Sequence, residues 1–266
     1  MKKILFQAVI SITMFFALWF GLSKIDWMSI LKIEQVTEST EKKLGDLFWD
    51  LYADSEKEIK SDNITKSLDS ILNKICISNK IDKSQIKLHL IKSDEVNAFA
   101  LPNKHLVINS ALIIASGTEA ELSGVISHEI AHMELNHVMK KLVKEIGLSV
   151  LISMSTGNAG SEKIKETIKL LSSSAYDRNL EKEADRKAVE YLKKSNIDPE
   201  DFANFLNRLG DSEETSMKYF TWISTHPDSK ERSADIIESI GKNAKTTHLI
   251  LKVDTWKQMK DYLTEN

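Results

Sequence analysis

Residues 118–134 read TEAELSGVISHEIAHME, and this stretch decides the fold that we expect. Thr118 followed by Glu121 forms a capping box, in which the hydroxyl oxygen satisfies a free backbone amide and the carboxylate reaches back to the cap. Apolar residues then recur at helical spacing beyond the stretch, as far as Leu142. The pattern predicts one long helix from Thr118 to about Gly147.

Within this helix, His128, Glu129 and His132 form a His-Glu-x-x-His motif. Positions four apart lie one above the other, with about 5–6 Å between their Cβ atoms, so the two imidazoles can face one zinc ion. Glu129 is rotated to the neighbouring face, from which its carboxylate can act as a general base toward water. The alternative is a helix with two ordinary histidines, which the apolar surroundings disfavour because desolvated imidazoles need partners.

A zinc site needs a third protein ligand. His137 misses the register of a third histidine by one residue, and we interpret it as a surface or structural histidine. Cys76, the single cysteine, is interpreted as a buried apolar residue. Residues 178–192, RNLEKEADRKAVEYL, place Glu181 and Asp185 four apart, so Glu181 can ligate the metal while Asp185 accepts the ring N–H of a ligand histidine. The alternative is a solvated helix laced with charge pairs.

The segments around the motif predict a mainly helical domain with a small sheet. Residues 86–114 alternate in short apolar stretches separated by turn residues, which predicts strands. Residues 33–79 carry apolar residues at helical spacing, which predicts two helices. Residues 148–175 contain an apolar stretch too short to span a bilayer, and we interpret the segment as a buried plug, with a lid or a membrane contact as alternatives.

Residues 4–22, ILFQAVISITMFFALWFGL, contain no charge and are long enough to span the hydrocarbon core of a membrane. Lys2 and Lys3 precede them, which favours an N-terminus inside the cytoplasm and the remainder of the chain outside. We therefore expect a single N-terminal anchor and a periplasmic or exterior catalytic part. The alternative is secretion after cleavage of a signal peptide, although Gly21 and Ser23 make a poor cleavage site.

The composition limits the classes of protein to be considered. The chain has 266 residues, with only 9 Gly and 3 Pro, which favours long helices and one sizeable catalytic domain with a small accessory segment. The formal net charge is −3, and no basic block with interleaved aromatics occurs, which disfavours nucleic acid as a partner.

Four motifs in a fixed order resemble a known family. HEIAH at residues 128–132 is followed by RNLEKEAD at residues 178–185, with residues 96–114 before them and STHPDSKER at residues 224–232 after them. Together they are similar to the membrane-linked zinc peptidases that include HtpX, BepA, the Oma-type mitochondrial peptidases and the CaaX prenyl-protein endopeptidase. Two departures are Asn103-Lys104, where the family usually has two glycines in a hairpin near the cleft, and Asp177, where it often has serine.

The resemblance implies that Glu181 is the third zinc ligand and Asp185 its companion, with Glu183 as the alternative if the register is displaced. It also implies that His226 approaches the active site, where it either bonds the developing oxyanion or occupies the open metal position in a latent state. A histidine that only orders the turn before Pro227 is the alternative.

The resemblance also assigns the substrate strand. Asn97, Ala98, Phe99 and Ala100 would form an edge strand that binds the peptide through main-chain hydrogen bonds. Arg232 is expected to pair with a carboxylate near the turn after His226.

We therefore predict a mainly α (α+β) fold, a gluzincin-like metallopeptidase domain of packed helices with a small β-sheet. The predicted divisions are an anchor at 1–33, a helical lead-in at 34–84, the peptidase domain at 85–245 and a tail at 246–266. The predicted function is a zinc endopeptidase with one Zn²⁺ per chain, acting on membrane-associated or misfolded polypeptides with Glu129 as general base. The alternatives are a membrane-tethered, chaperone-like or binding protein with a structural or latent zinc site, and a metal hydrolase that is not a peptidase. The sequence leaves the oligomeric state open.

Overall fold

The computed structural model describes residues 2–23, 33–211, 220–241 and 249–265, and the chain divides into two units, Met1–Thr40 and Glu41–Asn266. The first unit contains helix α1, Lys2–Ser23. No helix within the described residues is both long and apolar enough to cross a bilayer. Part of the predicted anchor at 1–33 lies outside the described residues, and so does the predicted domain boundary at residue 245. The anchor and this boundary therefore remain predictions.

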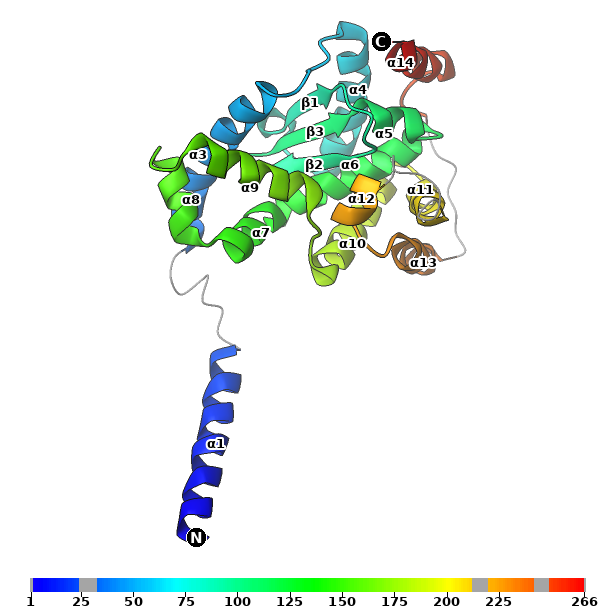
Figure 1. Cartoon of the computed structure of the whole chain (residues 1–266). Helices are drawn as coiled ribbons and strands as arrows, with labels where there is room; N and C mark the ends of the chain where they lie inside the picture. Colours follow the sequence, from blue (N-terminus) through cyan, green and yellow to red (C-terminus); the bar gives the residue numbers. More distant parts are fainter. Residues whose placement is uncertain (1, 24–32, 212–219, 242–248, 266) are drawn as a thin grey trace. The chain divides into compact units, whose positions relative to one another are not determined.

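The two predicted lead-in helices are α3, Ile33–Ala53, and α4, Asp62–Asn79 (Figure 1). In α4 the buried residues recur every three or four positions, because only one face of the helix meets the core. Cys76 belongs to this buried face, as expected.

The predicted sheet has three strands in the order β1-β3-β2 (Figure 1). They are β1, Lys87–Ile91, β2, Ala98–Leu101, and β3, His105–Asn109, with the short helix η1, Lys83–Gln85, before them. The central strand β3 is fully buried. It pairs with β1 in parallel and with β2 in antiparallel orientation. Strand β2 therefore lies at one edge of the sheet.

The β2–β3 hairpin forms with Asn103 and Lys104 at the positions where the family resemblance predicts two glycines. Asn103 and Lys104 adopt φ angles of +58° and +56°, the left-handed region that glycine enters without steric cost. Compensating bonds hold them, because the Asn103 backbone N–H donates to Glu41 and the Lys104 ammonium donates to Glu134 at 2.8 Å.

The helix that carries the His-Glu-x-x-His motif is shorter than predicted. Helix α6 spans Glu119–Glu134, and Asn136, with φ +56°, turns the chain into a separate helix α7, His137–Ile146. The predicted single helix to Gly147 is wrong, because the apolar spacing continues across a break that one left-handed residue produces. The cap is partly as predicted: the Thr118 hydroxyl accepts from the Glu121 N–H, but the Glu121 carboxylate reaches the N–H of Gly117 instead of the cap.

Three further helices precede α10. They are α5, Ser110–Ala115, α8, Leu148–Ser155, and α9, Ser161–Ser173. Helix α9 lies beside the edge strand β2 (Figure 1). The interpretation of 148–175 as a plug holds for part of it, since α8 buries Leu151 and Met154 while Ile152 is exposed.

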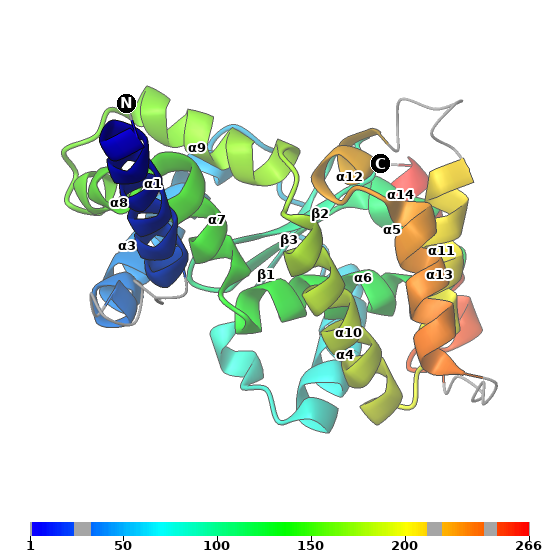
Figure 2. The ribbon, with the colours of Figure 1, turned by 90° about the horizontal axis from the view of Figure 1, so that it is seen from below.

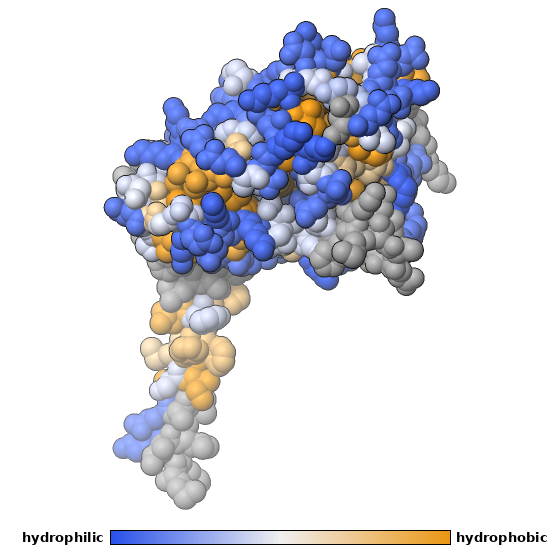
Figure 3. All heavy atoms as spheres, turned by 45° about the horizontal axis from the view of Figure 1, so that its top comes forward, coloured by the Kyte–Doolittle hydropathy of each residue, from blue (hydrophilic) through white to orange (hydrophobic). Residues whose placement is uncertain are grey.

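The remaining described helices follow α9 along the chain. They are α10, Arg178–Lys194, α11, Pro199–Asp211, α12, Phe220–Thr225, α13, Ser229–Ile240, and α14, Val253–Glu265. Helix α6 packs against α10, α11 and β2, and α11 packs against α13 (Figure 2). The tail is tied to the start of α6, because the Glu119 carboxylate accepts the backbone N–H groups of Ile250 and Leu251. Hydrophilic residues cover most of the face of this unit in Figure 3, with apolar areas between them.

Candidate metal centre

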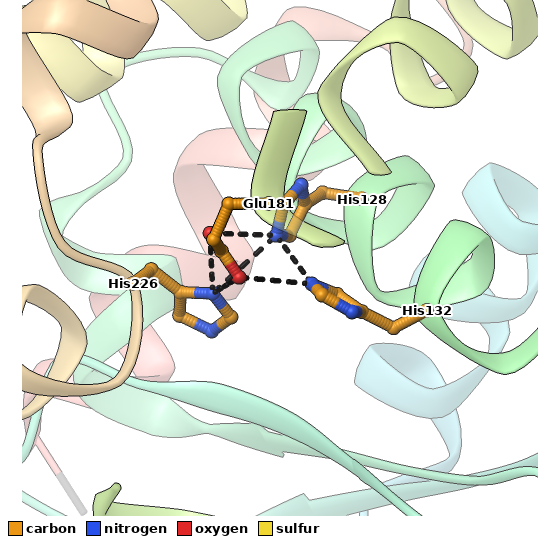
Figure 4. A group of neighbouring side chains, drawn as sticks. All are labelled: His128, His132, Glu181 and His226. Carbon is orange, nitrogen blue, oxygen red and sulfur yellow. Dashed lines mark hydrogen bonds and ion pairs between the residues drawn. The ribbon is translucent and has the colours of Figure 1, made fainter. Parts of the chain in front are cut away.

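The motif histidines lie together at the centre of the domain. His128 and His132 are both fully buried in α6, and their Nε2 atoms are 2.9 Å apart (Figure 4). The four-residue spacing on one helix produces this approach, as predicted from the sequence.

Glu181 reaches the two imidazoles from α10. Its Oε1 lies 3.2 Å from Nε2 of His132, and its Oε2 lies 3.6 Å from Nε2 of His128. Helices α6 and α10 are packed against each other, which is how a residue far along the chain arrives here. Glu183 does not join the group: its side chain is 43% exposed and lies 3.4 Å from Nε2 of His137.

His226, directly after α12, completes the group. Its Nδ1 lies 3.2 Å from both Glu181 oxygens and 3.4 Å from Nε2 of His128. One ligand atom from each of His128, His132, Glu181 and His226 falls within 4.8 Å of all the others. Three imidazole nitrogens and a carboxylate at such distances are the donor set that zinc prefers, so the residues fit a bound Zn²⁺.

The protonation states of the group suit metal binding. Burial lowers the pKa of His132 and of His226 to about 4 and also lowers the pKa of His128, which keeps the three rings neutral at pH 7. Burial opposes ionisation of Glu181, but the neighbouring Arg232 guanidinium holds its pKa well below the usual value. Neutral imidazoles and an ionised carboxylate are the forms that ligate a cation.

Asp185 and Arg232 support the group from outside it. Nδ1 of His128 lies 3.0 Å from Oδ1 of Asp185, so a proton on Nδ1 leaves Nε2 free toward Glu181 and His132. Arg232 donates to both oxygens of Asp185 at 2.7 Å and lies 2.7 Å from Glu181. The expected carboxylate partners of Arg232 are therefore these two.

Glu129 lies at the inner wall of the site. It is fully buried, and Oε1 is 3.4 Å from Nε2 of His226. Neither oxygen makes a well-aligned hydrogen bond among the described residues, although the Ala100 backbone N–H is close enough to favour the ionised form. Burial, followed by the charge of Glu181, raises the pKa of Glu129 well above its usual value. A buried carboxylate without a well-aligned bond of its own is available to a water molecule or a substrate.

Three neighbours of the group could not be foreseen from the sequence. His137, interpreted as a surface or structural histidine, is fully buried, and its Nδ1 lies 3.1 Å from Nδ1 of His132; the surface interpretation is wrong because α7 turns back toward the site. The Tyr176 ring stacks on His132 with centroids 4.1 Å apart, and the Lys141 ammonium lies 4.2 Å from the Tyr176 centroid. Burial lowers the pKa of Lys141 to about 8.

The predicted substrate strand lies beside the site. Asn97, Ala98, Phe99 and Ala100 are all buried, and β2 packs against α6 on one side and α9 on another. The Asn97 carbonyl accepts from the Asn109 N–H in β3, so by antiparallel alternation the backbone groups of Ala98 and Ala100 point away from β3, toward the edge that pairs with no strand among the described residues.

Comparison of this chain with known proteins identifies similar peptidases. Residues 63–240 match the model of peptidase family M48. The beta-barrel assembly-enhancing protease of Escherichia coli K12 is 27% identical over 208 residues, which cover 73% of this chain and 42% of that protein. The mitochondrial metalloendopeptidase OMA1 of Bos taurus is 29% identical over 163 residues, which cover 55% and 31%, and the metalloprotease LoiP of Escherichia coli K12 is 28% identical over 177 residues, which cover 64% and 68%.

The chain spans less than half the length of the beta-barrel assembly-enhancing proteases that it matches. The matched segment nevertheless contains all four residues of the metal group, and it extends over more than half of the chain. The family resemblance inferred from the motifs is therefore confirmed: the chain belongs to peptidase family M48.

Proposed function

We propose that this member of peptidase family M48 is a zinc endopeptidase that hydrolyses peptide bonds in membrane-associated or misfolded proteins. The observation that carries the proposal is the convergence of His128 and His132 from α6 with Glu181 from α10, beside the buried carboxylate of Glu129. A purely structural zinc site has no use for such a carboxylate, which argues against a binding protein without activity.

The chain's own residues supply binding and proton transfer. A zinc ion held by His128, His132 and Glu181 would polarise the substrate carbonyl and lower the pKa of a water molecule. Glu129 would take the proton from that water and return it to the leaving amine. A raised pKa suits this role, because the same group must accept a proton and then release it near neutral pH.

His226 is proposed to regulate or assist this step. Its Nδ1 is one of the four converging ligand atoms, and its Nε2 lies 3.4 Å from Glu129. A fourth protein ligand would take the position that a catalytic site keeps for water, so the closeness of His226 supports a latent arrangement. When His226 moves aside, its ring N–H is within reach of a developing oxyanion.

The edge of β2 that faces away from β3 is proposed to hold the substrate. The backbone groups of Ala98 and Ala100 point away from β3, and an extended peptide can pair with them as an added strand. Because β2 packs on α6, such a peptide would lie near Glu129.

We further propose the membrane anchor at residues 1–33 and a catalytic domain at 85–245 that faces the periplasm or exterior. The charge-free stretch at residues 4–22 after two lysines supports this orientation. The name of the Escherichia coli relative, which refers to β-barrel assembly, supports substrates that are themselves assembling or misfolded proteins.

The direct test uses the full chain. Zinc content and cleavage of casein are measured with and without chelator for the wild type and for Glu129→Gln. We expect one zinc per chain in both proteins and cleavage in the wild type alone, abolished by the chelator. A Glu129→Gln protein that cuts at the wild-type rate would exclude the mechanism.

A further inference from the structure

A cavity lies beside the start of β2, outside the metal group. Its volume is about 380 Å³, and its walls come from the end of α3, from β2, from the end of β3, from α9 and from α12. It adjoins the proposed substrate path, because Phe99 of β2 lines it and Ser224, two residues before His226, forms another part of the wall.

Two buried amides in its wall have acceptor atoms without a partner. Nδ2 of Asn97 donates to the Ser172 carbonyl at 3.1 Å, and Nδ2 of Asn109 donates to the Glu95 carbonyl at 3.1 Å. These bonds fix the orientation of each amide, because a carbonyl accepts only from the NH₂ group. Among the described residues, neither Oδ1 has a hydrogen-bond partner, although Asn97 is 1% exposed and Asn109 is 3% exposed. A buried acceptor without a donor is costly, so a ligand that donates here gains affinity.

The charged residues of the cavity wall also favour a cationic ligand. Glu56 and Glu95 both line it, and neither carboxylate has an ion-pair partner among the described residues. Burial, followed by the charges of Glu56 and Glu95, raises the pKa of Tyr52, which places both carboxylates near that ring. Among the described residues that line the cavity, Lys169 is the one cationic side chain, and it is exposed. Negative charge therefore exceeds positive charge among the described residues of this wall.

Aromatic rings supply the remaining wall. Tyr52 and Phe99 meet edge to face, with centroids 5.6 Å apart, and both line the cavity. The apolar stem of a long cationic side chain packs favourably on such rings while its charged end seeks acceptors.

We propose that this cavity is a specificity subsite that receives the Lys or Arg side chain of a polypeptide lying along β2. The inference rests on the proposed endopeptidase function, and it names the substrate class that the same cleft selects. Lys and Arg side chains carry hydrogen-bond donors and no acceptors, which matches the unpaired oxygens of Asn97 and Asn109 and the two carboxylates.

The test begins with a peptide series in which one position at a time around the scissile bond is Arg, Lys, Gln or Glu. Cleavage by the full chain with zinc is measured, and the cut sites are mapped by mass spectrometry. We expect kcat/KM to be about tenfold higher for Arg or Lys than for Gln at one fixed distance from the cut bond, the size of one or two charge-assisted hydrogen bonds.

The matched variants are Glu56→Gln/Glu95→Gln and, as a control with the same change of charge on α9, Glu162→Gln/Glu166→Gln. The first double variant should lower kcat/KM for the Arg peptide to near that for the Gln peptide and leave the Gln peptide unchanged. The control should change neither. Cleavage without a basic preference, or an equal loss for both peptides in the first double variant, overturns the subsite.

A binding measurement separates this inference from the proposed function. Fluorescence anisotropy of labelled Arg and Gln peptides is recorded with Glu129→Gln and with Glu129→Gln carrying the Glu56→Gln/Glu95→Gln pair. Tighter binding of the Arg peptide that the pair abolishes supports the subsite, even if no peptide is cut and the peptidase proposal fails. Equal binding of both peptides overturns the subsite.

Discussion

Nη1 of Arg232 lies 2.7 Å from Oε2 of Glu181, so the carboxylate that we propose as a zinc ligand is also part of a buried ion pair. The other oxygen of Glu181, Oε1, lies 3.2 Å from Nε2 of His132. The same guanidinium binds Asp185, which in turn faces His128. One arginine therefore orients both acids of the α10 motif, the ligand and its companion.

Replacement of Arg232 with Met should destabilise the metal-free protein by about 3 kcal/mol, because two buried carboxylates lose their compensating charge. Zinc supplies positive charge to the same group, so the variant should gain more stability from zinc than the wild type does. Arg232→Lys keeps the charge without the forked geometry and should fall between them. Urea unfolding with chelator and with zinc measures these differences; equal stability of all three proteins in chelator would contradict the role of the ion pair.

The assignment of Glu181 as a ligand is tested against its neighbour Glu183. Glu181→Gln should lower zinc affinity by at least about tenfold and abolish cleavage, since one anionic ligand is replaced by a weaker neutral one. Glu183→Gln, which removes the same charge two residues away from a half-exposed side chain, should retain both zinc and activity. Zinc titration against a competing chelator measures the affinities, and loss of zinc in Glu183→Gln alone would mean that the register is wrong.

Gly124, one turn before His128, marks a close approach of α6 to α11. A Cβ atom at this position would overlap the Phe202 side chain. Alanine in a helix interior usually stabilises by about 0.5–1 kcal/mol relative to glycine, but overpacking costs about 1–3 kcal/mol, so Gly124→Ala should be destabilising by roughly 1–2 kcal/mol. Gly160→Ala, where an added Cβ meets nothing within 4 Å, should change the free energy of unfolding by less than about 0.5 kcal/mol. Thermal and urea unfolding compare the two.

Local patterns predicted the helical half of the site well. The spacing of His128, Glu129 and His132 on one helix depends only on the helical repeat, and the apolar periods of α3 and α4 reflect one-sided burial. The third ligand, Glu181, could not be predicted in this way, since no local rule links α10 to α6. Its assignment depended on the ordered motifs of a family, and the packing of two helices brings it into place.

The errors have physical causes as well. Asn136 alone turns the chain between α6 and α7, while apolar spacing on both sides imitates a continuous helix. The burial of His137 and the stacking of Tyr176 and Lys141 beside His132 follow from that turn and from tertiary packing, which leave no periodic signal. The left-handed hairpin residues Asn103 and Lys104 are stabilised by partners elsewhere in the chain, which a local comparison with glycine misses.

A second histidine pair, far from the α6 motif in sequence, links the sheet to α3. Nε2 of His89 in β1 lies 3.0 Å from Nδ1 of His105 in β3, and the Trp49 ring of α3 stacks on His89 with centroids 3.4 Å apart. The charged groups facing the pair are Asp46 of α3, Glu58 of the α3–α4 connection and Lys87 of β1. Burial and Lys87 lower the pKa of His105 to about 4, and burial lowers the pKa of His89 despite Glu58.

This pair should make the protein less stable in mild acid. Both histidines have a pKa below the ordinary histidine value of about 6.5, so the unfolded chain binds more protons than the folded one below that pH. The contribution of His105 to stability is fully present above pH 6.5 and is lost as the pH falls toward 4, and the contribution of His89 is lost in the same direction. His105→Gln cannot take up a proton, so its free energy of unfolding should fall less steeply between pH 7 and pH 5 than that of the wild type. Altered packing changes the free energy of unfolding equally at pH 7 and at pH 5, and the histidines of the metal group titrate alike in both proteins. The difference in slope therefore reports on the His89–His105 pair. Parallel slopes would show that His105 does not titrate in this range.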